Sequence, residues 1–388
     1  MIHPDTRKLF PLKRGLVYLD QGGYGVTPNK VMRAREKLLR DIEIAPRTFF
    51  MYEYKPAWQA MRALVAQRFS IGAGDVALIE NTTEGINAIL QSFPFAPGDE
   101  ILTTTLTYGA IQNAATYIAR LHGVKVVQAD LRFPDPSPEQ CVEAVTKSIT
   151  ARTKMAILDH ITSSTGLVLP ITAMTKICRE RDAAVLVDAA HGPGQVAMDI
   201  GAINADWYVA NLHKWYFVPR GCGFLWSAPE QQDFLRPAVL SWDIAEKFPD
   251  RFDWTGTRDP TPWLSLPAAF AFMDHFGEEK VRAHNHQLVL EGAALLSSVW
   301  DVKVNTPECM IGSMVLVPLP EDLPYPLTEQ GRLHLQEDLA VKFKIIACVS
   351  FSTPTRHYLR IAASIYNALN DYKKLAQAIN TMRRDGLG

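Results

Sequence analysis

The stretch from Ala184 to Gly223 constrains the fold of this chain more than any other segment. It contains two apolar runs, 185–187 and 207–210, of the kind that fills strands buried on both faces. The first run ends on Asp188, and Lys214 follows the second. Ligands of parallel α/β sheets bind at the carboxyl ends of the strands. We therefore expect this acid and this amine to face one site, although they are 26 positions apart.

Upstream of this stretch, short strand-like runs alternate with helix-like segments, which predicts a mostly parallel sheet covered by helices. The expected strands are 16–19, 75–79, 100–105, 124–127 and 155–158, and the expected helices are 30–42, 56–69, 138–149 and 171–182. After Gly223 the pattern becomes less regular. Helices over 264–276 and 278–300, followed by strands over 313–317 and 344–348, predict a second, smaller domain.

The charge balance narrows the class of partner. Forty basic and 41 acidic residues give a formal charge of −1, which argues against electrostatic binding to nucleic acid or a membrane surface. No apolar run reaches the roughly 18–20 residues of a membrane helix, and the N-terminus lacks the pattern of a signal peptide. The five cysteines are scattered without C-x-x-C spacing. We expect a cytoplasmic protein with neither disulfides nor a metal site.

Three strings carry a family resemblance: VDAAH at 187–191, HKW at 213–215 and PRGCG at 219–223. They resemble the class V aminotransferase family, which are fold-type I enzymes that use pyridoxal 5'-phosphate (PLP). The group includes cysteine desulfurases, kynureninases and isopenicillin N epimerases. The resemblance implies an α/β fold with a mostly parallel central sheet in a large domain, 21–262. A smaller α+β domain would comprise 1–20 and 263–388.

The resemblance also implies roles for the residues at the cofactor ring. Lys214 would bond covalently to PLP and then act as acid and base at the substrate Cα, as a desolvated lysine of lowered pKa does. Asp188 would hold the proton on the pyridine nitrogen. His191 stands where desulfurases have glutamine, near the phenolic oxygen of PLP. Tyr108 would stack on the ring and take part in catalysis.

A second group of residues is expected at the cofactor phosphate. The string NTTEGIN at 81–87 is similar to a phosphate-binding motif of the family, and a helix N-terminus there favours an anion. We therefore expect Thr82, Thr83 and His213 to hold the phosphate. In this family a Gly-Thr loop crosses a homodimer interface, which assigns Gly256-Thr257 to the site of the partner subunit. Ser163 stands where desulfurases have asparagine, so the resemblance implies that it is a further cofactor contact.

Two residues are expected at the substrate. Arg360, in the string YLRIAAS, would bind the α-carboxylate with its planar fork of donors. Tyr24 follows a glycine-rich turn that borders the substrate entrance in the family. Cys348 lies near the position of the nucleophilic cysteine of desulfurases, but its apolar context favours a buried structural thiol.

The reaction stays open at this point, because PLP chemistry diverges after the Cα proton is lost. Strings such as HITSSTGLVLP at 160–170 resemble isopenicillin N epimerases, which places epimerisation or racemisation of an amino-acid substrate first. Elimination at a C–S bond and transamination are the alternatives. A ligand-binding or regulatory protein of the same fold is the alternative that is not an enzyme. The sequence identifies neither the substrate nor a second acid or base opposite Lys214.

Overall fold

A seven-stranded sheet forms the centre of the computed structural model, which describes residues 2 and 4–385. Its strands are β2 (Val76–Ile79), β3 (Glu100–Thr104), β4 (Lys125–Ala129), β5 (Thr153–Asp159), β6 (Ala184–Ala189), β7 (Trp207–Asn211) and β8 (Gly223–Ser227). The order across the sheet is β2-β8-β7-β6-β5-β3-β4, and β8 alone runs antiparallel to its neighbours. The expected α/β fold with a mostly parallel sheet is confirmed.

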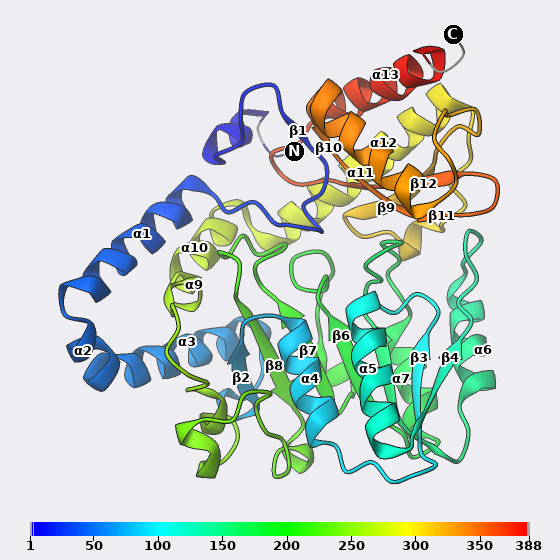
Figure 1. The fold of residues 1–388 in the computed structure, drawn as a ribbon. Coiled ribbons are helices and arrows are strands. Elements are labelled where there is room, and N and C mark those ends of the chain that lie inside the picture. Colours follow the sequence, from blue (N-terminus) through cyan, green and yellow to red (C-terminus); the bar gives the residue numbers. More distant parts are fainter. Residues whose placement is uncertain (1, 3, 386–388) are drawn as a thin grey trace.

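Helices connect successive strands and cover the sheet, as Figure 1 shows. They are α4 (Thr82–Ser92), α5 (Gly109–His122), α6 (Pro138–Ser148), α7 (Ile171–Arg179) and α8 (Ile200–Ile203). The middle strands β6 and β7 are buried on both faces, as their continuous apolar runs predict. This burial fixes the register of the strand ends that carry the polar residues.

Four further helices pack against the same core: α1 (Asn29–Ile44), α3 (Tyr54–Phe69), α9 (Thr261–Leu264) and α10 (Leu266–Phe276). The short helix α2 (Pro46–Thr48) follows α1 at the outer edge of the molecule and is exposed (Figure 1). Trp58 of α3 and Trp263 of α9 are buried against each other, with ring centroids 4.8 Å apart. This contact joins segments that are about 200 residues apart in the sequence.

A second, smaller layer contains a three-stranded antiparallel sheet in the order β11-β12-β9. Its elements are α11 (Glu278–Trp300), β9 (Met314–Pro318), α12 (Glu329–Phe343), β10 (Ile345–Ile346), β11 (Cys348–Ser352), β12 (His357–Ala362) and α13 (Leu369–Asp385). β1 (Val17–Tyr18) returns to this layer and pairs with β10. The sequence predicted one strand over 344–348, and the structure has two there. The helices α5, α12 and α13 were not expected. The division into domains at 21–262, with 1–20 and 263–388, stays a proposal.

The segment 20–25 joins the two layers by lying against the backbone of Lys214. The amide of Gln21 donates to the Lys214 carbonyl over 2.6 Å. A Cβ atom on Gly25 would lie 2.3 Å from the carbonyl oxygen of His213, so only glycine permits this approach. Among the residues described, no helix has the length and apolarity needed to cross a membrane.

Candidate active site

The strand ends of the large sheet open into a cavity of about 880 Å³. Asp188 lies one residue before the end of β6, and Lys214 follows β7 by three residues. The expectation that both face one site is met, because both line this cavity. The other lining residues named in the sequence analysis are Tyr24, Thr82, Thr83, Tyr108, Ser163, His191, His213, Cys348 and Arg360.

The amine of Lys214 is held by a short chain of hydrogen bonds. Its Nζ lies 3.0 Å from Nε2 of His191. The Nδ1 atom of the same imidazole accepts a hydrogen bond from the indole of Trp215 over 3.3 Å. Burial lowers the pKa of the lysine to about 8, although the carboxyl of Asp188 acts in the opposite direction. A large fraction of this amine is therefore neutral near pH 8, as a nucleophile or base must be.

Two buried carboxyl groups, those of Asp159 and Asp188, line the cavity side by side. Asp188 and Asp159 are paired in register on β6 and β5, and their exposed fractions are 4% and 2%. Burial raises the pKa of both carboxyls, and the charge of Asp188 raises that of Asp159 further. The N–H of Ala190 donates to Asp188 over 2.9 Å and opposes the shift there. Sequence reasoning missed Asp159, since no motif singles it out.

The N-terminus of α4 forms a third part of the cavity. Thr82 and Thr83 are its first two residues, and Asn81 caps it by accepting from the N–H of Glu84 over 3.0 Å. Asn211 at the end of β7 accepts from the N–H of Thr82 over 3.0 Å. A helix N-terminus with two hydroxyls favours an anionic group.

Arg360 reaches the cavity from β12 of the smaller layer and is 4% exposed. Its Nη2 lies 2.7 Å from a carboxylate oxygen of Asp20, and its Nη1 donates to the carbonyl of Ser163. Its Nε is buried without a partner among the residues described. Sequence reasoning missed Asp20, whose contact with Arg360 spans 340 positions. It also missed Arg332 and Ser350, which line the same side of the cavity.

The mouth of the cavity is more open than its floor. Tyr24 is 71% exposed and Tyr108 is 47% exposed. Thr257 does not line the cavity of its own chain and is exposed. The next residue, Arg258, is held with its guanidinium 4.7 Å from the ring centre of Trp263.

Cys348 also lines the cavity. Burial raises the pKa of its thiol, which disfavours the reactive thiolate.

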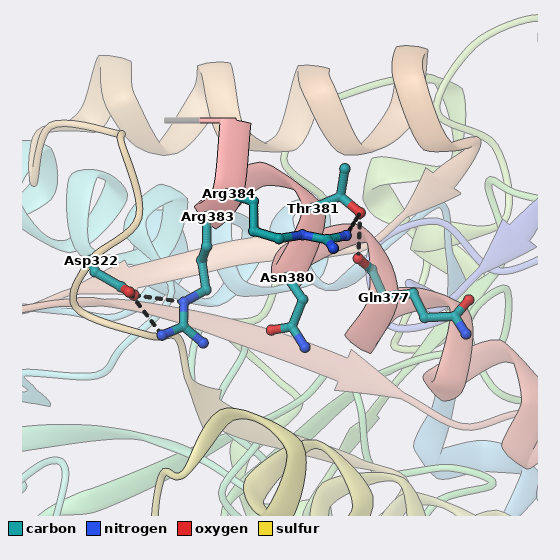
Figure 2. Close-up of a pocket in the computed structure, with 6 residues that line it drawn as sticks. All are labelled: Asp322, Gln377, Asn380, Thr381, Arg383 and Arg384. Carbon is teal, nitrogen blue, oxygen red and sulfur yellow. Dashed lines mark hydrogen bonds and ion pairs between the residues drawn. The ribbon is translucent and has the colours of Figure 1, made fainter. Parts of the chain in front are cut away.

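A second hollow lies on the outer helix α13, and Figure 2 shows the six side chains that line it. Its Arg383 is paired with both carboxylate oxygens of Asp322 over 2.7 Å. The guanidinium of Arg384 donates to the hydroxyl of Thr381. This hollow lacks the buried amine and carboxyl of the strand-end cavity, so the latter is the candidate active site.

The residues of the cavity fit pyridoxal phosphate. The cofactor carries an aldehyde, a pyridine nitrogen and a phosphate, and the cavity offers a buried amine, a buried carboxyl and a helix N-terminus. The buried, unpartnered Nε of Arg360 and Oδ2 of Asp159 also leave polar capacity for a bound molecule. The fold is that of fold-type I PLP enzymes, and the lining of the cavity fits this cofactor.

Comparison with known proteins gives the family. The model of the family described as aminotransferase class-V matches residues 17–321. This chain belongs to the class V aminotransferase family, as its motifs predicted, and it is a PLP-dependent enzyme.

Two curated relatives carry different activities in their names. The chain is 32% identical to a putative L-cysteine desulfhydrase of Oryza sativa, covering 96% of this chain and 84% of the relative. It is 29% identical to the isopenicillin N epimerase of Amycolatopsis lactamdurans, covering 98% of both. Among solved structures, the cystine C–S lyase C-DES has a TM-score of 0.83 at 19% identity, covering 95% of this chain and 98% of that one. This last likeness shows the fold alone.

Proposed function

We propose that this enzyme eliminates hydrogen sulfide from L-cysteine or a closely similar amino acid. In this reaction cysteine and one water molecule give pyruvate, ammonia and hydrogen sulfide. The proposal rests on one observation: Lys214, an amine of lowered pKa, lines a single cavity together with Asp188 and Arg360. Elimination requires one such group. The desulfhydrase relatives support the same choice.

Lys214 would perform the proton transfers. Bound PLP supplies an electron sink that acidifies the substrate Cα–H bond. The neutral amine of Lys214 accepts this proton, and the bonding pair forms the Cα–Cβ double bond while the Cβ–S bond breaks. Sulfur leaves as hydrosulfide with the electron pair of the Cβ–S bond and takes the proton held by Lys214, which gives hydrogen sulfide and restores the neutral amine. The released 2-aminoacrylate then tautomerises and takes up water, which gives pyruvate and ammonia.

The other predicted residues would hold the reactants. Asp188 would keep the pyridine nitrogen protonated, and His191 would contact the phenolic oxygen. The guanidinium of Arg360 would bind the α-carboxylate, which uses its unpartnered Nε–H. Thr82, Thr83 and His213 would hold the phosphate, Ser163 would contact the cofactor, Tyr108 would stack on the ring and Tyr24 would border the entrance.

We also propose that the enzyme is a homodimer in which Thr257 of one subunit completes the site of the other. Several large apolar side chains of the segments 49–53 and 242–245 are exposed, among them Met51 (59%), Tyr52 (74%) and Trp242 (87%). The segment 250–254 packs on the same region, because Arg62 pairs with Asp250 and the ring of Trp254 contacts Phe50. A second copy of the chain would cover this surface. The free cysteines support a reducing, cytoplasmic location.

Product analysis tests the proposed reaction. The PLP-loaded enzyme is incubated with L-cysteine, and sulfide, pyruvate and ammonia are measured together. We expect the three products in equal amounts. Borohydride reduction followed by peptide mapping should place the cofactor on Lys214. Absence of all three products with cysteine and with cystine would refute the elimination.

Epimerisation remains the second candidate, because the sequence resemblance and the epimerase relatives favour it. The same incubation in D₂O distinguishes the two. Deuterium at Cα with inverted configuration and no sulfide would indicate an epimerase. Pyruvate formation without inversion would indicate the lyase.

A further inference from the structure

The indole of Trp215 determines which nitrogen of His191 carries the proton. An indole N–H only donates, so the Nδ1 atom that it contacts over 3.3 Å must be the acceptor. The neutral imidazole then carries its proton on Nε2. This Nε2 lies 3.0 Å from the Nζ of Lys214. With that proton on Nε2, the lysine nitrogen is the acceptor of this hydrogen bond, which a neutral amine can be and an ammonium cannot.

We propose that Trp215 is a positioning residue, whose indole N–H holds His191 in the tautomer that donates its Nε2–H to the side-chain nitrogen of Lys214. The residue acts through His191 and does not itself touch Lys214's nitrogen. The proposal deepens the proposed function, because Lys214 is the residue on which the proton transfers depend.

The packing around the two rings fixes this arrangement. His191 is 1% exposed and Trp215 is 2% exposed. A Cβ atom on Gly22 would lie 3.3 Å from Cε1 of His191 and 3.4 Å from Cζ2 of Trp215, so backbone covers the edges of both rings. Trp215 also belongs to a small apolar cluster with Met314 and Ala362 of the smaller layer. This packing fixes the orientation of the indole ring, so that its N–H points toward Nδ1 of His191.

The imidazole is also the neutral form that this argument requires. Burial lowers the pKa of His191 well below its usual value, and the positive charges of Lys214, Arg360 and His213 lower it further. Around the lysine, Asp188 and Asp20 raise its pKa and Arg360 lowers it. A change from Trp215 to phenylalanine alters none of these charges.

The direction of the effect follows from the tautomer. In the Trp215→Phe variant, Nδ1 of His191 loses its donor, so the imidazole is free to carry its proton on Nδ1 instead. Nε2 then accepts a hydrogen bond from the Lys214 ammonium and stabilises the charged form. We expect the pH midpoint for deprotonation of Lys214 to rise by about 1 unit.

The effect is measured in the full-length chain in two ways. In the PLP-loaded enzyme, the pH titration of the visible absorbance band reports the protonation of the Lys214 nitrogen that is bonded to the cofactor, which is a different equilibrium from that of the free amine. In the cofactor-free chain, the rate of reductive methylation of Lys214 is followed by mass spectrometry across the pH range. The second readout does not depend on PLP. If borohydride fails to attach PLP to Lys214 in the wild type, the proposed function fails, while the methylation profile still tests Trp215.

A double-mutant cycle separates positioning from a structural effect. His191→Gln removes the imidazole and with it the choice between its two tautomers. Trp215→Phe should therefore leave the Lys214 midpoint unchanged in the His191→Gln background. Trp207→Phe is the matched control, since Trp207 is fully buried and its indole nitrogen has no partner among the residues described. Equal shifts with and without His191, no shift in the Trp215→Phe single variant, or a similar shift in Trp207→Phe would each overturn the proposal.

Discussion

The floor and the mouth of the cavity are built in different ways. The floor consists of Asp159, Asp188, His191 and Arg360, whose exposed fractions are between 1% and 4%. They lie on strands or directly after them, where the hydrogen-bonded ladder fixes their positions. The mouth consists of Tyr24 and Tyr108, which are 71% and 47% exposed. The floor is complete within one chain, whereas the mouth is open to solvent. We propose that Thr257 of the partner subunit completes the phosphate side of the same cavity.

Removing the amine that contacts His191 of the floor should have the largest effect. Lys214→Ala deletes the group that would bond the cofactor and move the proton, so we expect kcat to fall at least about a thousandfold. Borohydride should no longer attach PLP to the chain. Lys176→Ala, an exposed lysine on α7, is the control and should keep full activity. A Lys214→Ala enzyme with more than a tenth of the wild-type kcat would contradict the assignment.

Changing the carboxylate-binding group should have an intermediate effect. Arg360→Lys keeps the charge but loses the planar fork, and the loss of about 2 kcal/mol corresponds to roughly 30-fold in kcat/KM, mainly through KM. The measurement compares cysteine with cysteamine, which lacks the carboxylate.

The same variant should treat cysteamine as the wild type does, since no carboxylate is then to be bound. An equal loss with both compounds would show that Arg360 supports the structure of the site and does not recognise the carboxylate. Arg356→Lys, at an exposed pair with Glu321, is the matched control.

These two predictions concern residues that the sequence itself indicated. Asp188 and Lys214 were predictable because each stands at or just after a continuous apolar run, and the end of a parallel strand is where ligands bind. Asp20 was not predictable, because its ion pair with Arg360 joins the segment after β1 to the strand β12, 340 positions further along the chain. Trp215 reads as an ordinary buried aromatic until its indole nitrogen is seen beside His191.

Of the helices that were not predicted, α12 lacks a clear sequence signal, whereas α13 has one. In α12, Leu335 and Leu339 are buried while Leu333 and Val341 are exposed, so its apolar residues do not form one face. Its pattern gives a weak helical signal. In α13, Tyr372, Leu375, Ile379 and Met382 are buried at spacings of three and four residues. That periodicity was present in the sequence and would have indicated the helix.

The smallest expected effect concerns the surface that we assign to the partner subunit. Trp242 is 87% exposed, and Trp242→Ser removes apolar area from the surface that we assign to a second copy. We expect the dimer to dissociate at protein concentrations about tenfold higher than for the wild type, as measured by analytical ultracentrifugation. Leu121→Ser, at a 58% exposed leucine on α5, should leave the association unchanged.

The affinity for PLP should follow the association state. Where the variant is monomeric, the hydroxyl of the partner's Thr257 is missing, so PLP should bind a few-fold more weakly, which is the worth of one hydrogen bond. Raising the protein concentration should restore the wild-type affinity. If the monomer binds PLP as tightly as the dimer, then Thr257 of the partner subunit takes no part in holding the cofactor, and the cavity of one chain suffices to bind it.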